Sequence, residues 1–470
     1  MITQKKTVRT LRVFAAAAVT AAVAIAADAP AAAAAPAPAV AAPPRAADNP
    51  LSFADGRVVF DIDWRLTAEY RDNDSDFDDD ADAAADTDAL LSRFRIGLAL
   101  RPVPWIKLYA QGQDSRETWS ERGREPNVNG AGGNAEFDLR QGYVELANYQ
   151  EFPVGLSLGR QIFQYGDGRF LADSAWGNVG RSFDGVKLRL QQDAWWAEAF
   201  WASVVTIERG EFDEHKDDES VTGLYLSSQQ VPNHVIDLYG FHLDSDSGPL
   251  EGQYTTVGTR IVSRLAKGSP WDYKGEAAFQ FGDRHQGTAE VDIAAVALHA
   301  ALGYTFHDAP WRPRIGLSYD YASGDGDRTD GDSATFRTPY PTSHAWYGRQ
   351  DIVGLSNIHN PRLSFKVHPT AKLAVTLEYN AFWLDDTADY AYRANGVTPV
   401  RRTTPGGQDV RDARASSQLG QEVDLVLDYA VSKNLKLHAG ASTFLAGQYL
   451  SDTGAGDNAV YYYLQSTLTF

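Results

Sequence analysis

Basic side chains recur on one face of several alternating segments in this sequence. In "RVVFDIDWRLTAEYR" (57–71), Phe60, Ile62 and Trp64 alternate with polar residues, and Arg65 lies on the polar side. The same parity gives a larger basic set, which comprises Arg65, Arg93, Arg95, Lys187, Arg189, Arg314, Lys436 and His438. Guanidinium and ammonium groups bind carboxylates through charge-assisted hydrogen bonds. The chemistry that this pattern indicates is therefore recognition of anions.

Acidic residues share these polar faces and offer the cations internal partners. They are Asp61, Asp63, Glu69, Glu276, Asp320, Glu378, Glu422 and Asp424. Two interpretations follow from the residues alone. The cations bind an anionic ligand, or they form ion pairs within a polar interior.

Two acidic stretches raise the question of metal binding. They are "DNDSDFDDDADAAADTD" (72–88) and "YASGDGDRTDGD" (321–332). Clustered carboxylates attract Ca²⁺, but the first stretch lacks the Gly and Glu spacing of an EF-hand loop from any starting Asp. We therefore interpret both as solvated loops and predict no metal site.

Enzymatic motifs are weak. "GLSLG" (155–159) has the G-x-S-x-G spacing, yet a nucleophile elbow needs a strand, a tight turn and a helix, whereas this match lies inside a strand pattern. The ten His residues show no H-E-x-x-H or similar metal spacing. We expect no catalysis and no cofactor, although a site of scattered Ser, His and Asn would leave no such spacing.

The elements that carry these residues are strands. Period-two segments recur from residue 57 to the end of the chain, and we count about 18 of them. Short connections include 101–104, 151–155, 191–194, 230–233, 307–310, 368–371 and 431–434. Between them fall long ones at roughly 72–89, 114–135, 166–182, 209–219, 244–252, 283–290, 322–361, 385–420 and 446–459.

This alternation of short and long connections favours one architecture. An up-and-down outer-membrane barrel has short turns on one rim and long loops on the other, whereas a Greek-key sandwich has no reason to sort its loops by parity. We predict an all-β, transmembrane, antiparallel up-and-down β-barrel of the outer-membrane type. The alternating final strand ends on Phe470, and this terminal aromatic residue is similar to the signal that such proteins present to the barrel insertion machinery.

The N-terminal region predicts export. Four cations (Lys5, Lys6, Arg9 and Arg12) precede an Ala-dominated apolar stretch that is too short to span a bilayer as a helix. We assign residues 1–27 to a Sec signal peptide, 28–56 to an Ala/Pro-rich disordered leader and 57–470 to the barrel. The expected location is the outer membrane of a Gram-negative cell, in contact with lipid and lipopolysaccharide.

The net charge excludes one class of partner. The full chain carries −19, and removal of the four signal-peptide cations makes this about −23. A nucleic-acid partner is therefore not expected. Two acidic stretches between strand patterns, 71–88 and 209–219, hold much of the excess.

Several long stretches resemble the alginate export family. They begin with "FDLRQGYVELAN" and "LSLGRQIFQYGDGRFLADSAWGNVGRSFDGVKLRL", continue with "FRTPYPTSHAWYGRQDIVGLSNIHNPRLSFKVHPTAKLAVTLEYNAFWLDDTADYAY", and end with "LGQEVDLVLDYAVSKNLKLHAGASTFLAGQYL". The resemblance implies a monomeric 18-stranded barrel with a basic constriction that passes an anionic uronic-acid polymer. It also implies that Arg140 and Arg160 belong to that constriction. Where the family has further arginines, this chain has His344, Arg349, Lys436 and His438.

The expected function is passive passage of an anionic polysaccharide, such as alginate or its oligomers, through a lumen lined by Arg and Lys. The selectivity residues expected are Arg65, Arg95, Arg140, Arg160, Lys187, Arg189, Arg314 and Lys436. A general or sugar- or anion-specific uptake porin is the first alternative. A barrel enzyme, or a structural or adhesive barrel, is the second.

Overall fold

The computed structural model of the chain describes residues 49–74, 76–81, 87–120, 133–208, 211–265, 268–286 and 289–470. The predicted signal peptide and residues 28–48 of the predicted leader lie outside these described residues. The last part of the leader segment joins the sheet, since β1 (Ser52–Phe53) pairs with the start of the first long strand.

Eighteen long strands form one antiparallel sheet, and this confirms the predicted fold class. They are β2 (Val58–Asp72), β3 (Thr87–Val103), β4 (Ile106–Thr118), β5 (Ala135–Leu146), β6 (Val154–Gln161), β7 (Phe183–Gln191), β8 (Trp195–Thr206), β10 (Glu219–Ser228), β11 (His234–Ser245), β12 (Gly252–Ser263), β13 (Trp271–Gln286), β14 (Ala289–Thr305), β15 (Arg314–Ala322), β17 (Ile358–Val367), β18 (Leu373–Trp383), β19 (Gln418–Ala430), β20 (Leu435–Ala446) and β21 (Ala459–Thr469).

Few other elements are present. The two-residue strands β9 (Glu214–His215) and β16 (Asp332–Ser333) pair with β8 and β14. In the described part of the chain the helices are two single 3₁₀ turns, η1 (Gly248–Leu250) and η2 (Val410–Asp412), and α2 (Gln448–Thr453). Among the described residues, none of the helices has the length and apolar content needed to cross a bilayer.

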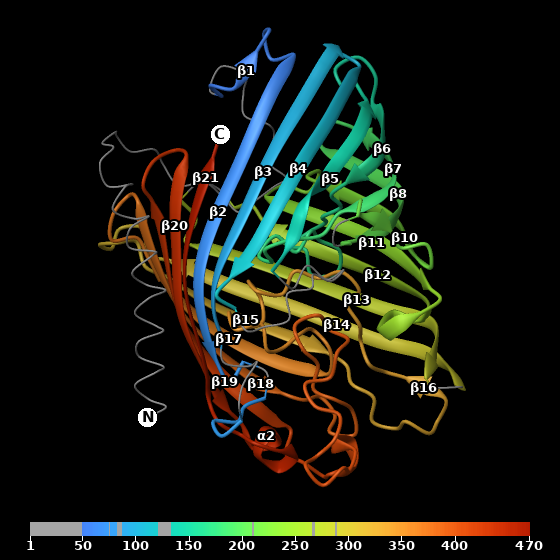
Figure 1. The fold of residues 1–470 in the computed structure, drawn as a ribbon, viewed down its shortest axis with the longest axis vertical. Coiled ribbons are helices and arrows are strands. Elements are labelled where there is room, and N and C mark those ends of the chain that lie inside the picture. Colours follow the sequence, from blue (N-terminus) through green and yellow to red (C-terminus); the bar gives the residue numbers. More distant parts are fainter. Residues whose placement is uncertain are drawn as a thin grey trace.

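The sheet closes on itself because the last strand pairs with the first long one. β21 runs antiparallel to β2 from Asp63↔Thr469 to Asp72↔Val460, and Figure 1 shows blue β2 beside red β21. Phe470 extends this pairing, since its amide donates to Ile62 at 3.0 Å and its carbonyl accepts from the Ile62 amide at 3.2 Å. Closure leaves no free edge in the wall, so the backbone groups of the strands are satisfied within it.

The two faces of the wall differ as the period-two pattern predicts. Apolar side chains such as Leu224 and Leu317 point outward and are 65% and 60% exposed. Polar residues of opposite parity point inward and are buried, among them Arg65 and Asp320. An apolar exterior over a polar interior is the arrangement that lipid outside the barrel requires.

The connections alternate in length as expected over most of the chain, with two exceptions between β11 and β14. The connection predicted as long at 244–252 spans only 246–251, and its length lies between those of the neighbouring connections 229–233 and 264–270. The predicted long connection at 283–290 is wrong, because β13 continues to Gln286 and β14 begins at Ala289. Uninterrupted pairing from Trp271↔Tyr304 to Gln286↔Ala289 explains the difference, since it makes these two strands a tight hairpin. In Figure 1, α2 lies at the lower end of the barrel and the C-terminus lies near the other end.

Loops fold inward and make a core inside the barrel. Residues 162–182, 323–357 and 384–417 connect β6 to β7, β15 to β17 and β18 to β19. Phe163, Phe170, Phe336, Tyr340 and Tyr347 are all nearly or fully buried in one cluster with inward side chains of the wall. A backbone bridge between Leu171 and Tyr340 joins the first two loops. The loops thus determine which inward-facing wall residues stay accessible.

Candidate functional site

Strand register places four residues that are far apart in sequence along one line of the inner wall. Lys436 of β20 pairs with Thr467 of β21, Thr467 pairs with Arg65 of β2, and Arg65 pairs with Arg93 of β3. Barrel closure alone brings Lys436 to Arg65, because this line crosses the seam between the last and first long strands. Arg95 lies two residues along β3 on the same inward face.

Arg140 joins this group through a bulge. In the β4–β5 pairing, Gln111 opposes Gln141 and Gly112 opposes Leu139, so Arg140 is the extra residue that no partner opposes. A bulge reorients the strand locally. It explains why the alternation slips near this arginine in the sequence, and why its side chain is nonetheless buried inside the barrel.

A segment of the inward loop covers these arginines. We call residues 173–181 the belt. Arg65 donates to the Ala175 carbonyl at 2.9 Å and to the Gly177 carbonyl at 2.8 Å, and Arg93 donates to Ala175 at 2.9 Å. The Val179 carbonyl accepts from Gln113 at 2.8 Å, Arg140 at 3.2 Å and Arg95 at 3.4 Å.

The covered cluster carries excess positive charge. Among the described residues, two ion pairs reach its four arginines: Arg93 with Asp63 at 3.1 Å and Arg140 with Asp173 at 3.4 Å. Arg95 also donates to the Gln113 side-chain oxygen at 2.5 Å, and the remaining acceptors are the neutral belt carbonyls. Arg65, Arg93, Arg95 and Arg140 form what we call the arginine cluster, whose formal balance with these two carboxylates is +2.

Arg160, the other arginine implied by family resemblance, is held separately. Its guanidinium makes two hydrogen bonds to Asp184, at 2.8 and 3.0 Å, and also donates to the carbonyls of Leu139 and Asp213. Gly159 before it has φ of +118°, a conformation that favours glycine and marks the local break in strand alternation. Arg160 thus fixes the ends of β5 and β6 to neighbouring segments.

The remaining predicted selectivity residues are more open to the interior. Arg189 and Lys187 share Glu198, at 2.8 and 3.9 Å, and Arg314 contacts Asp272 through two hydrogen bonds of 2.9 and 2.5 Å. Lys436 is exposed, and no ion pair to it is found among the described residues. The predicted set therefore divides into a loop-covered group and a group in contact with water.

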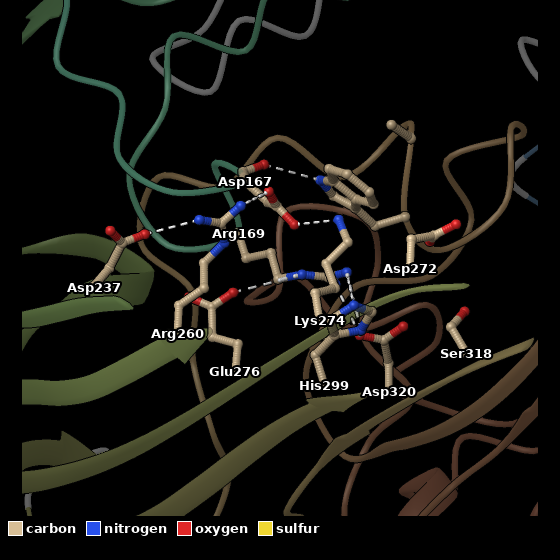
Figure 2. Close-up of polar contacts among 12 residues, drawn as sticks. Asp167, Arg169, Asp237, Arg260, Asp272, Lys274, Glu276, His299, Ser318 and Asp320 are labelled. Carbon is tan, nitrogen blue, oxygen red and sulfur yellow. Dashed lines mark hydrogen bonds and ion pairs between the residues drawn. The ribbon is translucent and has the colours of Figure 1, made fainter. Parts of the chain in front are cut away.

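A second charged network escaped the sequence analysis. Figure 2 shows loop residues Asp167 and Arg169 beside charged side chains of the wall. These side chains come from β12, β13, β14 and β15. Arg169 donates to Asp320 at 2.8 Å and contacts His299 at 3.1 Å, with Glu276 at 3.8 Å. Asp167 pairs with Lys274 at 2.6 Å and with Arg260, which in turn binds Asp237 at 2.8 Å.

This network fixes the loop electrostatically. Burial alone would raise the pKa of Asp167, but the Lys274 ammonium and the Arg260 guanidinium hold that pKa well below its usual range. Burial would likewise lower the pKa of Arg169, but Asp320, Tyr347, Glu276 and Asp167 together outweigh burial and raise that pKa. Both groups stay charged, so the loop remains docked. The sequence showed the charges of "GDGRF" between two strand patterns and placed Glu276 and Asp320 on polar faces, but it did not show that these groups meet.

Three of the residues at which the resemblance implies further basic side chains, His344, Arg349 and His438, make a third set of contacts. Arg349 bonds Glu378 at 3.0 Å, and its amide donates to Glu422 at 2.5 Å. His344 stacks on Trp176 of the belt with ring centroids 3.7 Å apart, and its Nδ1 contacts Asp351 at 2.9 Å. His438 lies between Asp428 at 2.8 Å and Tyr463 at 2.9 Å.

The geometry offers little for catalysis or metal binding. "GLSLG" lies within β6, without the helix of a nucleophile elbow. Among the described residues no group of His, Cys, Asp and Glu is arranged to hold a metal ion. Part of the first acidic loop lies outside the described residues. The arrangement provides a polar interior with a basic sector, by which we mean the arginine cluster together with Lys436.

Known structures share this fold. Pseudomonas aeruginosa OpdL aligns with a TM-score of 0.57 at 13% identity, covering 88% of this chain and 98% of that one. OpdK of the same organism, solved with vanillate, aligns with a TM-score of 0.56 at 12% sequence identity, and the alignment covers 87% of this chain and 98% of OpdK. Acinetobacter baumannii OccAB4 aligns with a TM-score of 0.54 at 14% identity, covering 87% of this chain and 98% of that one. The chain matches no curated protein.

Fold and interior together define an outer-membrane β-barrel of the porin type. Within that class, the family model described as "Alginate export" matches residues 57–461. The chain therefore belongs to the alginate export family, as the sequence stretches indicated. The family and the fold are those of channels.

Proposed function

We propose that the protein is a passive channel for an anionic polysaccharide or oligosaccharide of the uronic-acid type. One observation carries the proposal: four arginines on neighbouring strands form a cluster with an excess of positive charge on the inner wall. Carboxylates of a uronic-acid chain match guanidinium groups in charge and geometry. Family membership supports the same class of substrate.

The more open cations add basic side chains to other parts of the inner wall. Lys187 and Arg189 of β7, Arg314 of β15 and Lys436 of β20 come from three different strands, and the basic lining therefore does not depend on one loop. Weak sites in series suit transport, because a ligand must enter each site and also leave it.

Uptake of small carboxylates is the second candidate. The inward loops favour it, because they fill much of the interior with buried side chains. Vanillate, the ligand named with the similar OpdK structure, is a small carboxylate. Both candidates require anion preference, and they differ in the size of the solute.

Planar-bilayer recording tests the proposal. We expect a reversal potential in a salt gradient that shows anion preference, and block of the current by oligogalacturonate that deepens with concentration. Benzoate as competitor separates the two candidates, since a small-carboxylate porin would respond to it as strongly as to the oligomer. Cation preference without block would contradict both candidates, and absence of conductance would contradict any channel.

A further inference from the structure

We propose that the arginine cluster is an occluded polyanion-binding site, and that the belt is its built-in occupant, which the carboxylates of an acidic oligosaccharide displace. The inference rests on the proposed function and adds a mode of regulation to it. In this mechanism the ligand opens its own binding site.

The first support is the kind of acceptor that the belt supplies. Arg65 and Arg93 bind the carbonyls of Ala175 and Gly177, which carry no net charge. Hydrogen bonds between a guanidinium and a carboxylate are roughly twice as strong as those between neutral groups, and they are often bidentate. The one carboxylate of the belt, Asp173, contacts Arg140 at 3.4 Å and not Arg65 or Arg93. A ligand carboxylate that replaces a belt carbonyl at Arg65 or Arg93 therefore gains energy that these carbonyls do not supply.

The second support is a set of unused donors. Within the described part of the chain, the buried Nε–H groups of Arg65, Arg93 and Arg140 donate to no acceptor. A buried donor without a partner is unfavourable. A carboxylate approaching a guanidinium edge-on engages Nε and a terminal nitrogen together. The ligand would satisfy donors that remain unsatisfied under the belt. This difference between the belt-covered state and the ligand-bound state would shift the equilibrium toward the displaced belt.

The third support is the way the belt is anchored. The flanking parts of the loop are held by buried side chains: Arg169 on the one side, through the ionic network, and Phe183 at the start of β7 on the other. Between them, Ala175 is exposed and Trp176 and Gly177 are half-buried. In the proposed displacement, opening starts at these less buried residues while the flanking parts of the loop stay in place.

Specific contacts hold the belt closed at rest. The Asn178 side-chain amide donates to the carbonyls of Gly133, Arg116 and Ser92 at 2.8, 3.2 and 3.3 Å. The Val179 side chain is 1% exposed, and Trp176 stacks on His344. The resting state is therefore covered, and a thiol placed at position 179 should be protected.

The test uses the fact that the chain contains no cysteine. Val179→Cys makes a small change in a buried side chain and introduces the only thiol. The refolded full-length barrel is treated with a water-soluble maleimide, with and without oligogalacturonate. We expect the oligomer to speed labelling about tenfold or more at low salt, because reaction requires local opening. A neutral dextran oligomer should have no effect.

Two matched single-cysteine variants complete the design. Ala175→Cys lies on the exposed part of the belt and should react quickly in either condition. Val353→Cys is 1% exposed in the 323–357 loop and should stay protected in both. Oligomer-induced labelling of Val353→Cys to the same extent would mean general loosening and would overturn the inference.

The outcomes separate the inference from the function. Block of current by the oligomer without faster labelling of Val179→Cys would leave the channel proposal standing and overturn the displacement of the belt. Neither block nor faster labelling would reject both. Hydrogen–deuterium exchange of residues 173–181 in the unmodified protein gives the same readout if Val179→Cys fails to fold. Unchanged protection there, at oligomer concentrations that block, also overturns the inference.

Discussion

At the scale of single residues, His344 links pH to loop docking. Burial lowers the pKa of His344 below its ordinary value of 6.5, even though Asp351 pulls in the opposite direction. The unfolded chain therefore binds a proton more readily than the folded one. It follows that the free energy of unfolding is greatest above pH 6.5 and falls as the pH drops below that value.

We expect His344→Gln to remove part of this acid sensitivity. The wild-type protein should lose up to about 1.4 kcal/mol per pH unit below pH 6.5 from this group alone, and the variant should show a shallower slope. Urea unfolding of the barrel in detergent at pH 5 to 8 measures both. If the free energy of unfolding depends on pH equally in the two proteins, His344 does not take up a proton on unfolding in this pH range.

Arg169 makes a fully buried ion pair between the 162–182 loop and the wall. Its side chain is 1% exposed and faces Asp320, which is fully buried. Arg169→Gln leaves that carboxylate without its cation, so we expect a loss of about 3–5 kcal/mol in the free energy of unfolding. Urea titration measures the loss.

The double variant Arg169→Gln/Asp320→Asn supplies the control, because it removes the uncompensated charge together with the pair. It should be more stable than Arg169→Gln alone. If the single and double variants unfold at the same urea concentration, the ion pair does not hold the loop.

At the scale of elements, the pairing of β20 with β21 depends on a glycine. A Cβ added at Gly440 would overlap the ring of Tyr463 on the neighbouring strand. Tyr463 also donates to or accepts from His438, so its ring cannot move without loss of that contact. We expect Gly440→Ala to destabilise the barrel by about 1–3 kcal/mol.

Gly240→Ala is the matched control for this effect. Its added Cβ would lie 3.8 Å from Val257 Cγ1, which is ordinary contact distance. Thermal unfolding in the same detergent compares the two variants. Equal melting temperatures would show that the β20–β21 pairing accommodates the extra atom.

At the scale of the whole molecule, selectivity should follow the accessible cations rather than the net charge. The chain as a whole is acidic, at −19, whereas the arginine cluster and Lys436 make one sector of the interior basic. Lys436→Glu should therefore shift the reversal potential toward cations. Lys372→Glu, in the 368–372 turn outside the strands, should leave the reversal potential nearly unchanged and serves as control.

Salt should weaken this selectivity in the wild-type channel. The Debye length falls from about 10 Å at 0.1 M to about 3 Å at 1 M salt, so exposed charges are screened at the higher concentration. Reversal potentials measured at the same concentration ratio across this range test the point. A preference that persists unchanged at 1 M would point to steric selection instead.

The alternating pattern predicts inward and outward faces well because it is local. The sequence placed Arg65, Arg93 and Arg95 on a polar face, and the structure buries all three inside the barrel. The break in the pattern at Arg140 came from a bulge that only the β4–β5 pairing defines. The charge of Arg169 was visible, but its partners Asp320, Glu276 and His299 lie on three strands more than 100 residues away.

Strand periodicity, the alternation of turn and loop lengths over most of the chain, and the family could all be predicted from the amino-acid sequence. Each depends on local side-chain pattern or on long matching stretches. Which cations stay accessible depends on the tertiary fold. Register across the β2–β21 seam aligns Lys436 with Arg65. The inward loop then covers Arg65 and leaves Lys436 exposed. Register and loop docking depend on contacts between residues hundreds of positions apart, and no local pattern encodes them.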